Sequence, residues 1–338
     1  MNKKFVSLTL LSAIVALTFF VLPVKPQNIT TLYVEPQLTT IKPLRTFEIN
    51  ISIANVTDLA GWEFKLYYPN SLLNATEIKE GPFLKTAGGT FFMVKEFTDN
   101  YNETHGRIWA ACVLEGQGPG TSGAGTLAMI TFKAKLNGTA ILHLAETDLI
   151  DSEMPPNHIS HVTVDGGVKI LNVDISILNA EASKTIVGQG FPVNVSVAVK
   201  NQGETIETFN LTVYANTSEI ETKQITLDSN TSTTITFTWN TTNFTKGNYT
   251  ISAYAWPTPT ETDTTDNTFT DSWIYIAVPG DVNLDQKVDM KDIVLIIGKF
   301  GTNPTNPNWN PNYDINNDQK VDMKDIILTI SNFGKIDP

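Results

Sequence analysis

The sequence predicts a multidomain, mainly β chain, with two consecutive β-sandwiches followed by a small α-helical module. Three observations support this prediction. Apolar and polar residues alternate on a period of two through residues 28–170, and shorter runs of the same kind continue through 172–278. After Gly280 the apolar period becomes helical and one segment is repeated. We therefore expect domains at 28–170, 172–278 and 279–338, and 338 residues suffice for three.

The first sandwich is predicted from rows of alternating apolar residues, separated by clusters of Asp, Asn, Gly and Pro. In each row every second residue is apolar, which is typical of an antiparallel sheet with one solvated face. The rows are Phe47, Ile49, Ile51 and Ile53; Trp62, Phe64, Leu66 and Tyr68; and Ala128, Ile130, Phe132 and Ala134.

The second sandwich is predicted from short runs that end at turn residues such as those of Asn201–Gly203. The clearest runs are Val193–Val199, Phe209–Tyr214, Thr234–Trp239 and Tyr249–Trp256. A segment of about 105 residues with roughly seven short strands favours an immunoglobulin-like fold. Because no Pro- or Gly-rich linker occurs near Asn172, we expect the two sandwiches to lie close together.

The first 27 residues read as an export signal. Lys3 and Lys4 precede the uncharged stretch 5–23. This stretch is long for a signal peptide and long enough to span a bilayer, so cleavage and retention as an anchor both stay open. Either alternative leaves the rest of the chain secreted or at the cell surface. The net charge of −12 argues against nucleic acid and anionic membranes as partners.

Two further features concern the exported part of the chain. Cys112 is the only cysteine, so no intrachain disulfide forms, and its apolar surroundings predict a buried, inert thiol. Thirteen Asn-x-Ser/Thr sequons occur from Asn28 to Asn248. If they are used, the protein is a glycoprotein whose C-terminal module is free of sugar; the alternative is that Asn- and Thr-rich strands generate sequons by chance.

The C-terminal module contains an internal repeat with an offset of 33 residues, in which Asp281 aligns with Asp314. Because 15 of the 21 aligned residues are identical, the two copies are expected to share one fold. Each copy ends in an apolar stripe on one helix face, followed by Gly301 or Gly334, which we expect to cap the helices. The stripes are Ile293, Ile297 and Phe300, and Ile326, Ile330 and Phe333.

Each copy also places oxygen-bearing residues at loop positions 1, 3, 5, 9 and 12, which is the EF-hand order. Position 7 would contribute its backbone carbonyl. Hard oxygen ligands select calcium, so we predict two calcium ions. The predicted ligands are Asp281, Asn283, Asp285, Lys287, Asp289 and Asp292 in the first loop, and Asp314, Asn316, Asp318, Lys320, Asp322 and Asp325 in the second.

Two residues of each loop depart from the EF-hand pattern. Position 6, where the backbone usually requires a glycine with positive φ, holds Gln286 or Gln319. Position 12 holds Asp where Glu is usual, so the helix must approach the ion more closely. Four carboxylates in each loop repel one another without metal, so we expect calcium binding and folding of this module to be coupled.

The segment Asp281–Asp292 resembles the calcium loop of type I dockerin modules, which bind cohesins. The resemblance covers residues 280–335. It implies that loop positions 10 and 11 contact the cohesin, which here are Met290 and Lys291, and Met323 and Lys324. Because these pairs are identical, the resemblance implies two binding orientations related by a rotation of about 180°.

The two sandwiches also resemble known families. Residues 60–68 and 123–134 are similar to strands of cohesins, which implies a jelly-roll fold and a dockerin-bearing partner. The segments 195–203, 236–239 and 265–269 are similar to the cell-adhesion-related bacterial domain, CARDB, which implies an immunoglobulin-like spacer.

No catalytic pattern emerges, so the chain is predicted not to be an enzyme. His158 and His161 lack the further ligands that zinc requires. Most of the tryptophans Trp62, Trp109, Trp239 and Trp256 are expected in the cores rather than on a sugar-stacking platform. Two functions stay open. One is a scaffold that binds a cohesin and a dockerin, including head-to-tail self-association. The other is a carbohydrate-binding accessory of a polysaccharide-degrading complex.

Overall fold

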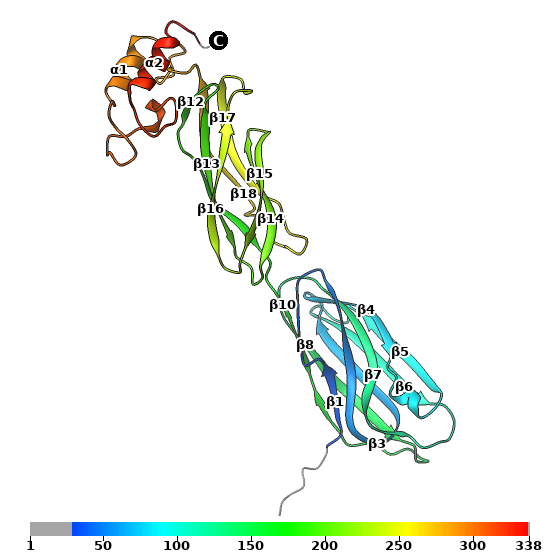
Figure 1. The fold of residues 1–338 in the computed structure, drawn as a ribbon. Coiled ribbons are helices and arrows are strands. Elements are labelled where there is room, and N and C mark those ends of the chain that lie inside the picture. The colour runs from blue at the N-terminus through cyan, green and yellow to red at the C-terminus, as the bar shows by residue number, and fades with distance from the viewer. Residues whose placement is uncertain (1–28, 337–338) are drawn as a thin grey trace, which may run out of the picture.

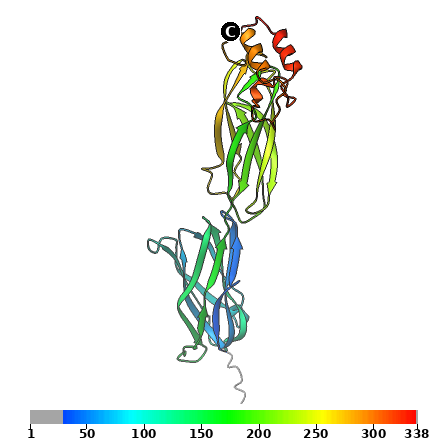
Figure 2. The same ribbon diagram turned by 90° about the vertical axis from the view of Figure 1, so that its left-hand side faces the viewer.

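A computed structural model describes residues 29–336 and places three domains in a row (Figures 1 and 2). The predicted signal or anchor at 1–27 lies outside the described residues. Two β-sandwiches follow one another along the row, and two short helices lie at its C-terminal end. The predicted fold class, mainly β with a small helical module, is confirmed.

The first sandwich is organised by β3 (Thr46–Pro69), a strand long enough to run through both layers. Its first half pairs with β1 (Thr31–Glu35) and β7 (Thr121–Ala134), and its second half with β6 (His105–Leu114) and β8 (Gly138–Asp151). Asn55 and Asp58, with φ of 57° and 56°, lie between the halves, where the register with β7 shifts. The remaining strands are β2 (Leu38–Ile41), β4 (Leu73–Glu80), β5 (Thr90–Thr98), β9 (Val162–Val164) and β10 (Gly166–Ile170).

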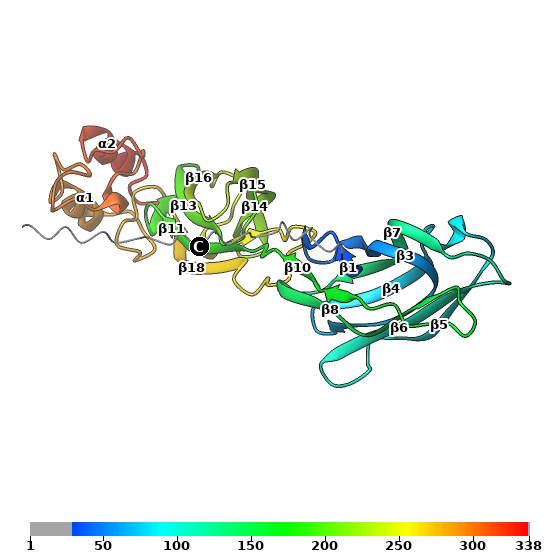
Figure 3. The ribbon, with the colours of Figure 1, turned by 90° about the horizontal axis from the view of Figure 1, so that it is seen from below.

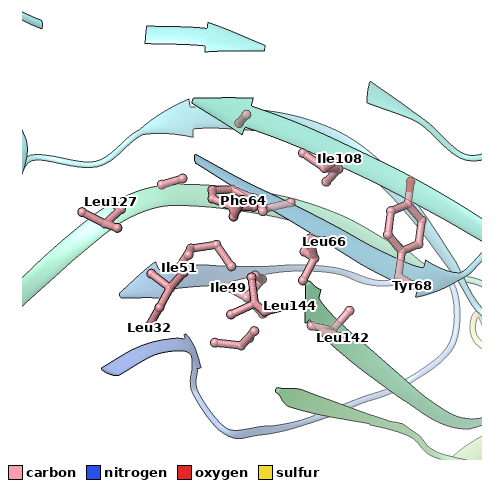
Figure 4. Close-up of a cluster of buried hydrophobic side chains, with 14 of the residues drawn as sticks. Leu32, Ile49, Ile51, Phe64, Leu66, Tyr68, Ile108, Leu127, Leu142 and Leu144 are labelled. Atoms are coloured by element: carbon pink, nitrogen blue, oxygen red, sulfur yellow. The ribbon is translucent and has the colours of Figure 1, made fainter. Parts of the chain in front are cut away.

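The apolar rows predicted for this domain face its core. Leu32, Ile51, Phe64 and Leu144 lie between the layers, and all are at most 1% exposed (Figure 4). The buried Tyr68 hydroxyl donates to Asp99 Oδ1 at 2.5 Å, so its polar end is satisfied. The predicted burial of Cys112 is also confirmed, because this residue is 3% exposed, and burial raises the pKa of its thiol to about 12.

The second sandwich consists of a three-stranded and a five-stranded sheet. The first contains β11 (Ile175–Ala182), β13 (Pro192–Asn201) and β16 (Ser232–Asn240). The second contains β12 (Ile186–Gly188), β18 (Thr268–Ala277), β17 (Gly247–Ala255), β14 (Glu207–Ala215) and β15 (Ser218–Leu227). Trp239, 1% exposed, packs at the centre against the rings of Phe244 and Tyr249.

The two sandwiches meet directly, as the missing linker predicted. Lys42 Nζ lies 2.7 Å from Glu207 Oε1, and Lys169 Nζ lies 2.7 Å from Glu204 Oε1. Glu204 also accepts a hydrogen bond from the Asn172 amide at 3.0 Å. These charge-assisted contacts join side chains on both sides of the short connection.

The helical module has a very small core. Its helices are α1 (Met290–Ile297) and α2 (Met323–Ser331), and the connection between them includes one 3-10 turn, η2 (Pro311–Tyr313). Five buried apolar residues form its centre, and Phe191 of the second sandwich packs against them. A core of this size needs bound metal or a packing partner for stability.

The predicted helix caps were wrong. The helices end at Ile297 and Ser331, before Gly301 and Gly334. Both glycines have positive φ, of 80° and 79°, but each N–H donates to the other repeat instead of to its own helix. No helix among the described residues is long and apolar enough to cross a membrane.

Candidate calcium loops and docking surfaces

In the first loop, three predicted ligands lie together. Carboxylate oxygens of Asp281, Asp285 and Asp292 all lie within 4.8 Å of one another. Asp281 and Asp292 are buried, whereas Asp285 is exposed. Clustered carboxylates suit a hard dication, because hard oxygen ligands with several negative charges favour calcium. The loop therefore has the donor chemistry that the spacing predicted.

Asp292 reaches the loop because it stands in the first turn of α1. Its Oδ2 accepts from the Asp289 N–H at 2.9 Å, and Asp289 Oδ1 accepts from the Lys291 N–H at 2.8 Å. The Asp289 side chain also accepts from the Asp292 N–H. Together with the Asp289 N–H bond to Asp292, this makes a capping box, which starts the helix and fixes the direction of the Asp292 carboxylate. Asp322 and Asp325 form the same arrangement in the second copy. Asp289 and Asp322 therefore begin the helices, and Asp289 stands outside the close group of three.

The loops turn at position 6 as the EF-hand order requires. Gln286 and Gln319 adopt positive φ, of 71° and 64°, in place of the usual glycine. Their N–H groups donate to the carboxylates of position 1, Asp281 at 3.1 Å and Asp314 at 2.8 Å. Asn283 and Asn316 each accept from the N–H two residues later, which further shapes the curl.

The second loop has the same residue types but a different arrangement. Asp314, Asp318 and Asp325 are not brought as close together as their counterparts, within the range that the structure describes. Asp318 Oδ1 is buried and makes no hydrogen bond to any described residue. Burial raises the pKa of the Asp314 and Asp325 carboxyls. A cation at this loop would satisfy Asp318 Oδ1 and offset the burial of the other two carboxylates.

Lysines at position 11 contact the acids at position 5. Lys291 Nζ lies 3.1 Å from Asp285 Oδ2, and Lys324 Nζ lies 2.7 Å from Asp318 Oδ2. Each lysine holds the pKa of its partner carboxyl below the usual range. Both lysine side chains are 66% exposed, so they also face solvent. Of the position 7 residues, Lys287 forms a β-bridge with Ile336.

The two helices expose matching apolar stripes. Val294 and Ile327, for example, are 60% and 57% exposed. Each stripe follows the spacing i, i+4 and i+7 and continues to a phenylalanine, so it occupies one helix face. The sequence pattern placed Ile293, Ile297 and Phe300 on one helix face. Of these three only Ile293 is buried, and Ile297 and Phe300 belong to the exposed stripe. The exposed stripes are Met290, Val294, Ile297 and Phe300, and Met323, Ile327, Ile330 and Phe333.

The second candidate surface is the outer face of the sheet β8-β3-β6-β5 in the first domain. Trp109 lies at its centre, where the ammonium groups of Lys65 and Lys95 are each 4.6 Å from the ring centroid. The Trp109 ring N–H donates to Glu63 Oε1 at 2.8 Å. The prediction that most of the four tryptophans are buried was wrong for two of them, because Trp109 is half-buried on this face and Trp256 is 49% exposed.

Depressions flank Trp109 along the sheet. One is largely apolar and is lined by Phe91, Met93 and Val113, which are 55%, 39% and 41% exposed. The other is more polar and is lined by Tyr67, His105, His143, Glu146 and Asp165, among others. In this second depression His143 Nδ1 lies 2.8 Å from Asp165 Oδ2. The face thus has a pocket that can hold an apolar group of a partner, and it also carries charged side chains of both signs.

The histidines set aside in the sequence have separate partners. His158 Nδ1 lies 2.7 Å from Asp148 Oδ1, and His161 Nε2 lies 2.8 Å from the Thr147 hydroxyl. A shared metal site between these histidines therefore has no support in the described residues.

Comparison with known proteins gives a domain assignment. The model of the cohesin domain matches residues 34–170, that of CARDB matches 161–271, and that of the dockerin type I domain matches 279–333. No curated protein matches the chain.

Several solved structures are similar to parts of the chain. A non-cellulosomal cohesin from Archaeoglobus fulgidus is 17% identical, with 42% of this chain and 91% of that chain covered and a TM-score of 0.33. A type I cohesin–dockerin complex from Clostridium thermocellum is 18% identical, with 43% and 94% covered and a TM-score of 0.34. A Pyrococcus furiosus CARDB domain is 22% identical, with 32% and 96% covered and a TM-score of 0.28. At these low values, the assignment depends on the family models.

The chain is therefore a modular protein that carries a cohesin domain, a CARDB domain and a type I dockerin domain, in this order. These are interaction modules, and no catalytic domain is found among them. Cohesin and dockerin domains on one chain support a role in protein–protein interaction. Dockerin type I domains generally bind calcium, and cohesin–dockerin modules are typically extracellular or at the cell surface.

Proposed function

We propose that this protein is a non-catalytic extracellular adaptor whose dockerin binds a cohesin only when calcium occupies both loops. Its own cohesin domain receives a dockerin from another chain. The CARDB domain acts as the spacer between these two binding modules. The proposed domain boundaries are 28–170, 172–278 and 279–338.

The exposed stripes on α1 and α2 carry this proposal. An apolar helix face that stays exposed in a folded domain marks an interaction site. The stripes are related by the same 33-residue offset as the calcium loops, and each begins at the methionine of loop position 10. Met290 with Lys291, or Met323 with Lys324, would then present the same contacts in either orientation.

Calcium would act on this surface through the capping boxes. Asp292 and Asp325 belong both to the predicted calcium ligands and to the first turn of a helix. Metal bound at the loop would fix that turn and, with it, the stripe that follows. Lys291 contacts Asp285, and Lys324 contacts Asp318. When these two acids bind calcium, both lysines would become available to a partner.

The test uses the full chain and a panel of immobilised type I cohesins. We expect at least one cohesin to retain the protein in calcium and to release it in EGTA. The variant carrying both Met290→Asp and Met323→Asp should not be retained, whereas Met154→Asp, which changes a methionine that is 78% exposed in the cohesin domain, should behave like wild type. Retention that survives EGTA would contradict calcium-dependent docking.

Head-to-tail assembly is the second part of the proposal. The dockerin and the β5–β6 edge of the cohesin domain lie at opposite ends of the molecule, so a self-compatible pair would form an open polymer (Figures 1 and 3). Equilibrium sedimentation should show oligomers in calcium and monomers in EGTA. A monomer in both solutions rules out self-assembly but not docking to another protein.

A carbohydrate-binding accessory is the alternative function. The depression lined by Tyr67, His105, His143, Glu146 and Asp165 favours it, because an aromatic ring beside several hydrogen-bonding groups can hold a sugar. Retention of the full chain on insoluble polysaccharide, and its loss in Tyr67→Ala, would support this function. Binding to a dockerin but to no glycan would support the adaptor.

A further inference from the structure

The dockerin is attached to the CARDB domain by specific contacts. Asn312, in η2, accepts from the N–H groups of Thr185 and Ile186 at 3.0 and 3.1 Å and donates to the Thr185 hydroxyl at 3.0 Å. A Cβ on Gly188 would lie 2.8 Å from Pro279 Cα, and one on Gly280 would lie 2.9 Å from Thr329 Cα. The backbones therefore approach closely on both sides of the boundary.

Lys184 is a buried charged residue of this interface. It lies between β11 and β12, is 3% exposed, and donates from Nζ to the Asp314 carbonyl at 2.5 Å. A buried ammonium is costly unless opposite charges and hydrogen bonds compensate it. Burial lowers the pKa of Lys184, and the charges that oppose this effect are Asp314 and Asp325 of the second calcium loop.

The contact with Lys184 makes the second calcium loop different from the first. The direct hydrogen bond from Lys184 goes to the residue at position 1 of the second loop. In the first loop three carboxylates already lie within 4.8 Å of one another, whereas the second loop has no such group within the described chain. Sequence identity between the repeats therefore does not make the sites equivalent.

A cation beside an acidic loop has opposite effects on the metal-free and the metal-bound loop. Without calcium the ammonium reduces the repulsion between Asp314, Asp318 and Asp325, which favours the folded loop. With calcium bound it adds repulsion against the dication. Because such coupling is reciprocal, an ammonium that is more stable beside the empty loop must weaken calcium binding there.

We propose that Lys184 is a built-in counter-charge of the second calcium loop, which holds this half of the dockerin against the CARDB domain without metal and makes its calcium site the weaker of the two. The inference rests on calcium binding by both loops. It adds that the sites fill in order and that the CARDB domain is a structural partner of the dockerin.

Calorimetric titration of calcium into the chelator-treated full chain tests this inference. We expect two binding steps in the wild type. In Lys184→Met the weaker step should tighten by several-fold, while the tighter step stays within about twofold. Lys184→Arg keeps the charge and should retain the two unequal steps. Lys200→Met changes a lysine near the C-terminal end of β13, whereas Phe191, which packs against the dockerin, precedes its other end; this variant should match wild type.

Hydrogen exchange of the calcium-free proteins gives a second readout. The N–H groups of Ile315 and Gln319, which donate to Asp325 and Asp314, should exchange several-fold faster in Lys184→Met than in wild type. Equal exchange rates, or a weaker step that is unchanged or weakened in Lys184→Met, would overturn the inference. Absence of any calcium binding in the wild type would instead contradict the proposed function.

Discussion

The Gly301 N–H donates to the Val321 carbonyl at 2.8 Å and so joins the end of the first repeat to the calcium loop of the second. The contact is repeated in the other direction, because Gly334 donates to Val288 at 2.8 Å. Each loop is thus completed by the end of the opposite helical segment. Neither half of the dockerin has its full set of backbone hydrogen bonds alone, so the two loops should open together.

Substitution of Gly301 and Gly334 tests whether the two reciprocal contacts between the repeats contribute equally. Gly301→Ala and Gly334→Ala should each cost on the order of 1 kcal/mol, because both residues have positive φ, of 80° and 79°. Gly298→Ala is the control, since Gly298 has an ordinary helical φ of −62°. Hydrogen exchange of the Val288 and Val321 amides in calcium measures the free energy of opening. A large cost for one glycine and none for the other would contradict the shared arrangement.

A substitution in only one of the two stripes should weaken cohesin binding much less than substitutions in both. If either repeat presents the same surface, Met290→Asp alone leaves the second orientation intact and should weaken cohesin binding by only about twofold. The same holds for Met323→Asp, whereas the double variant should lose binding. Biosensor measurements with the retained cohesin would decide this. Loss of binding in one single variant would show that only one orientation is used.

The CARDB domain should become less stable as the pH rises through the range in which Asp174 ionises. Burial and the neighbouring Asp266, Asp263 and Glu261 raise the pKa of Asp174 to about 6, from an ordinary value of 3.8. A carboxyl whose pKa is higher in the folded state binds more protons there than in the unfolded state. The free energy of unfolding therefore falls as the pH rises from about 4 to 6.

Asp174→Asn should remove this dependence and stabilise the domain at pH 7 by on the order of 1 kcal/mol, after allowance for solvent screening. Thermal unfolding at pH 4 and pH 7 measures the effect, with Asp228→Asn as a control in a turn of the same domain. The prediction is contradicted if Asp174→Asn destabilises the domain at pH 7.

Cys112 should be chemically inert in the folded protein. Its burial raises the pKa of the thiol to about 12, so almost no thiolate exists at pH 8. Mass spectrometry should find negligible alkylation by iodoacetamide at this pH, and rapid alkylation in guanidinium chloride. Rapid reaction of the native protein would show that β6 opens easily.

The sequence predicted those features that depend on local patterns. Period-two rows identified the inward faces of both sandwiches, because burial on a strand follows side-chain alternation. The oxygen spacing identified the loops, since an EF-hand turn is local. Lys184 was missed and Trp109 was wrongly expected in the core, because their surroundings depend on residues distant in sequence, such as Asp314 for the first and Lys65 and Lys95 for the second. The helix ends were predicted too far along the chain, because Gly301 donates its hydrogen bond to the other repeat and does not cap its own helix.

The number of calcium ions bound by the full chain tests the central claim most directly. Native mass spectrometry should detect two ions on the wild type, one on Asp292→Asn or Asp325→Asn, and none on the double variant. Far-UV circular dichroism of the same samples should show helix gained in step with the ions. A wild-type chain that binds no calcium, or a double variant that still binds two ions, would contradict the account.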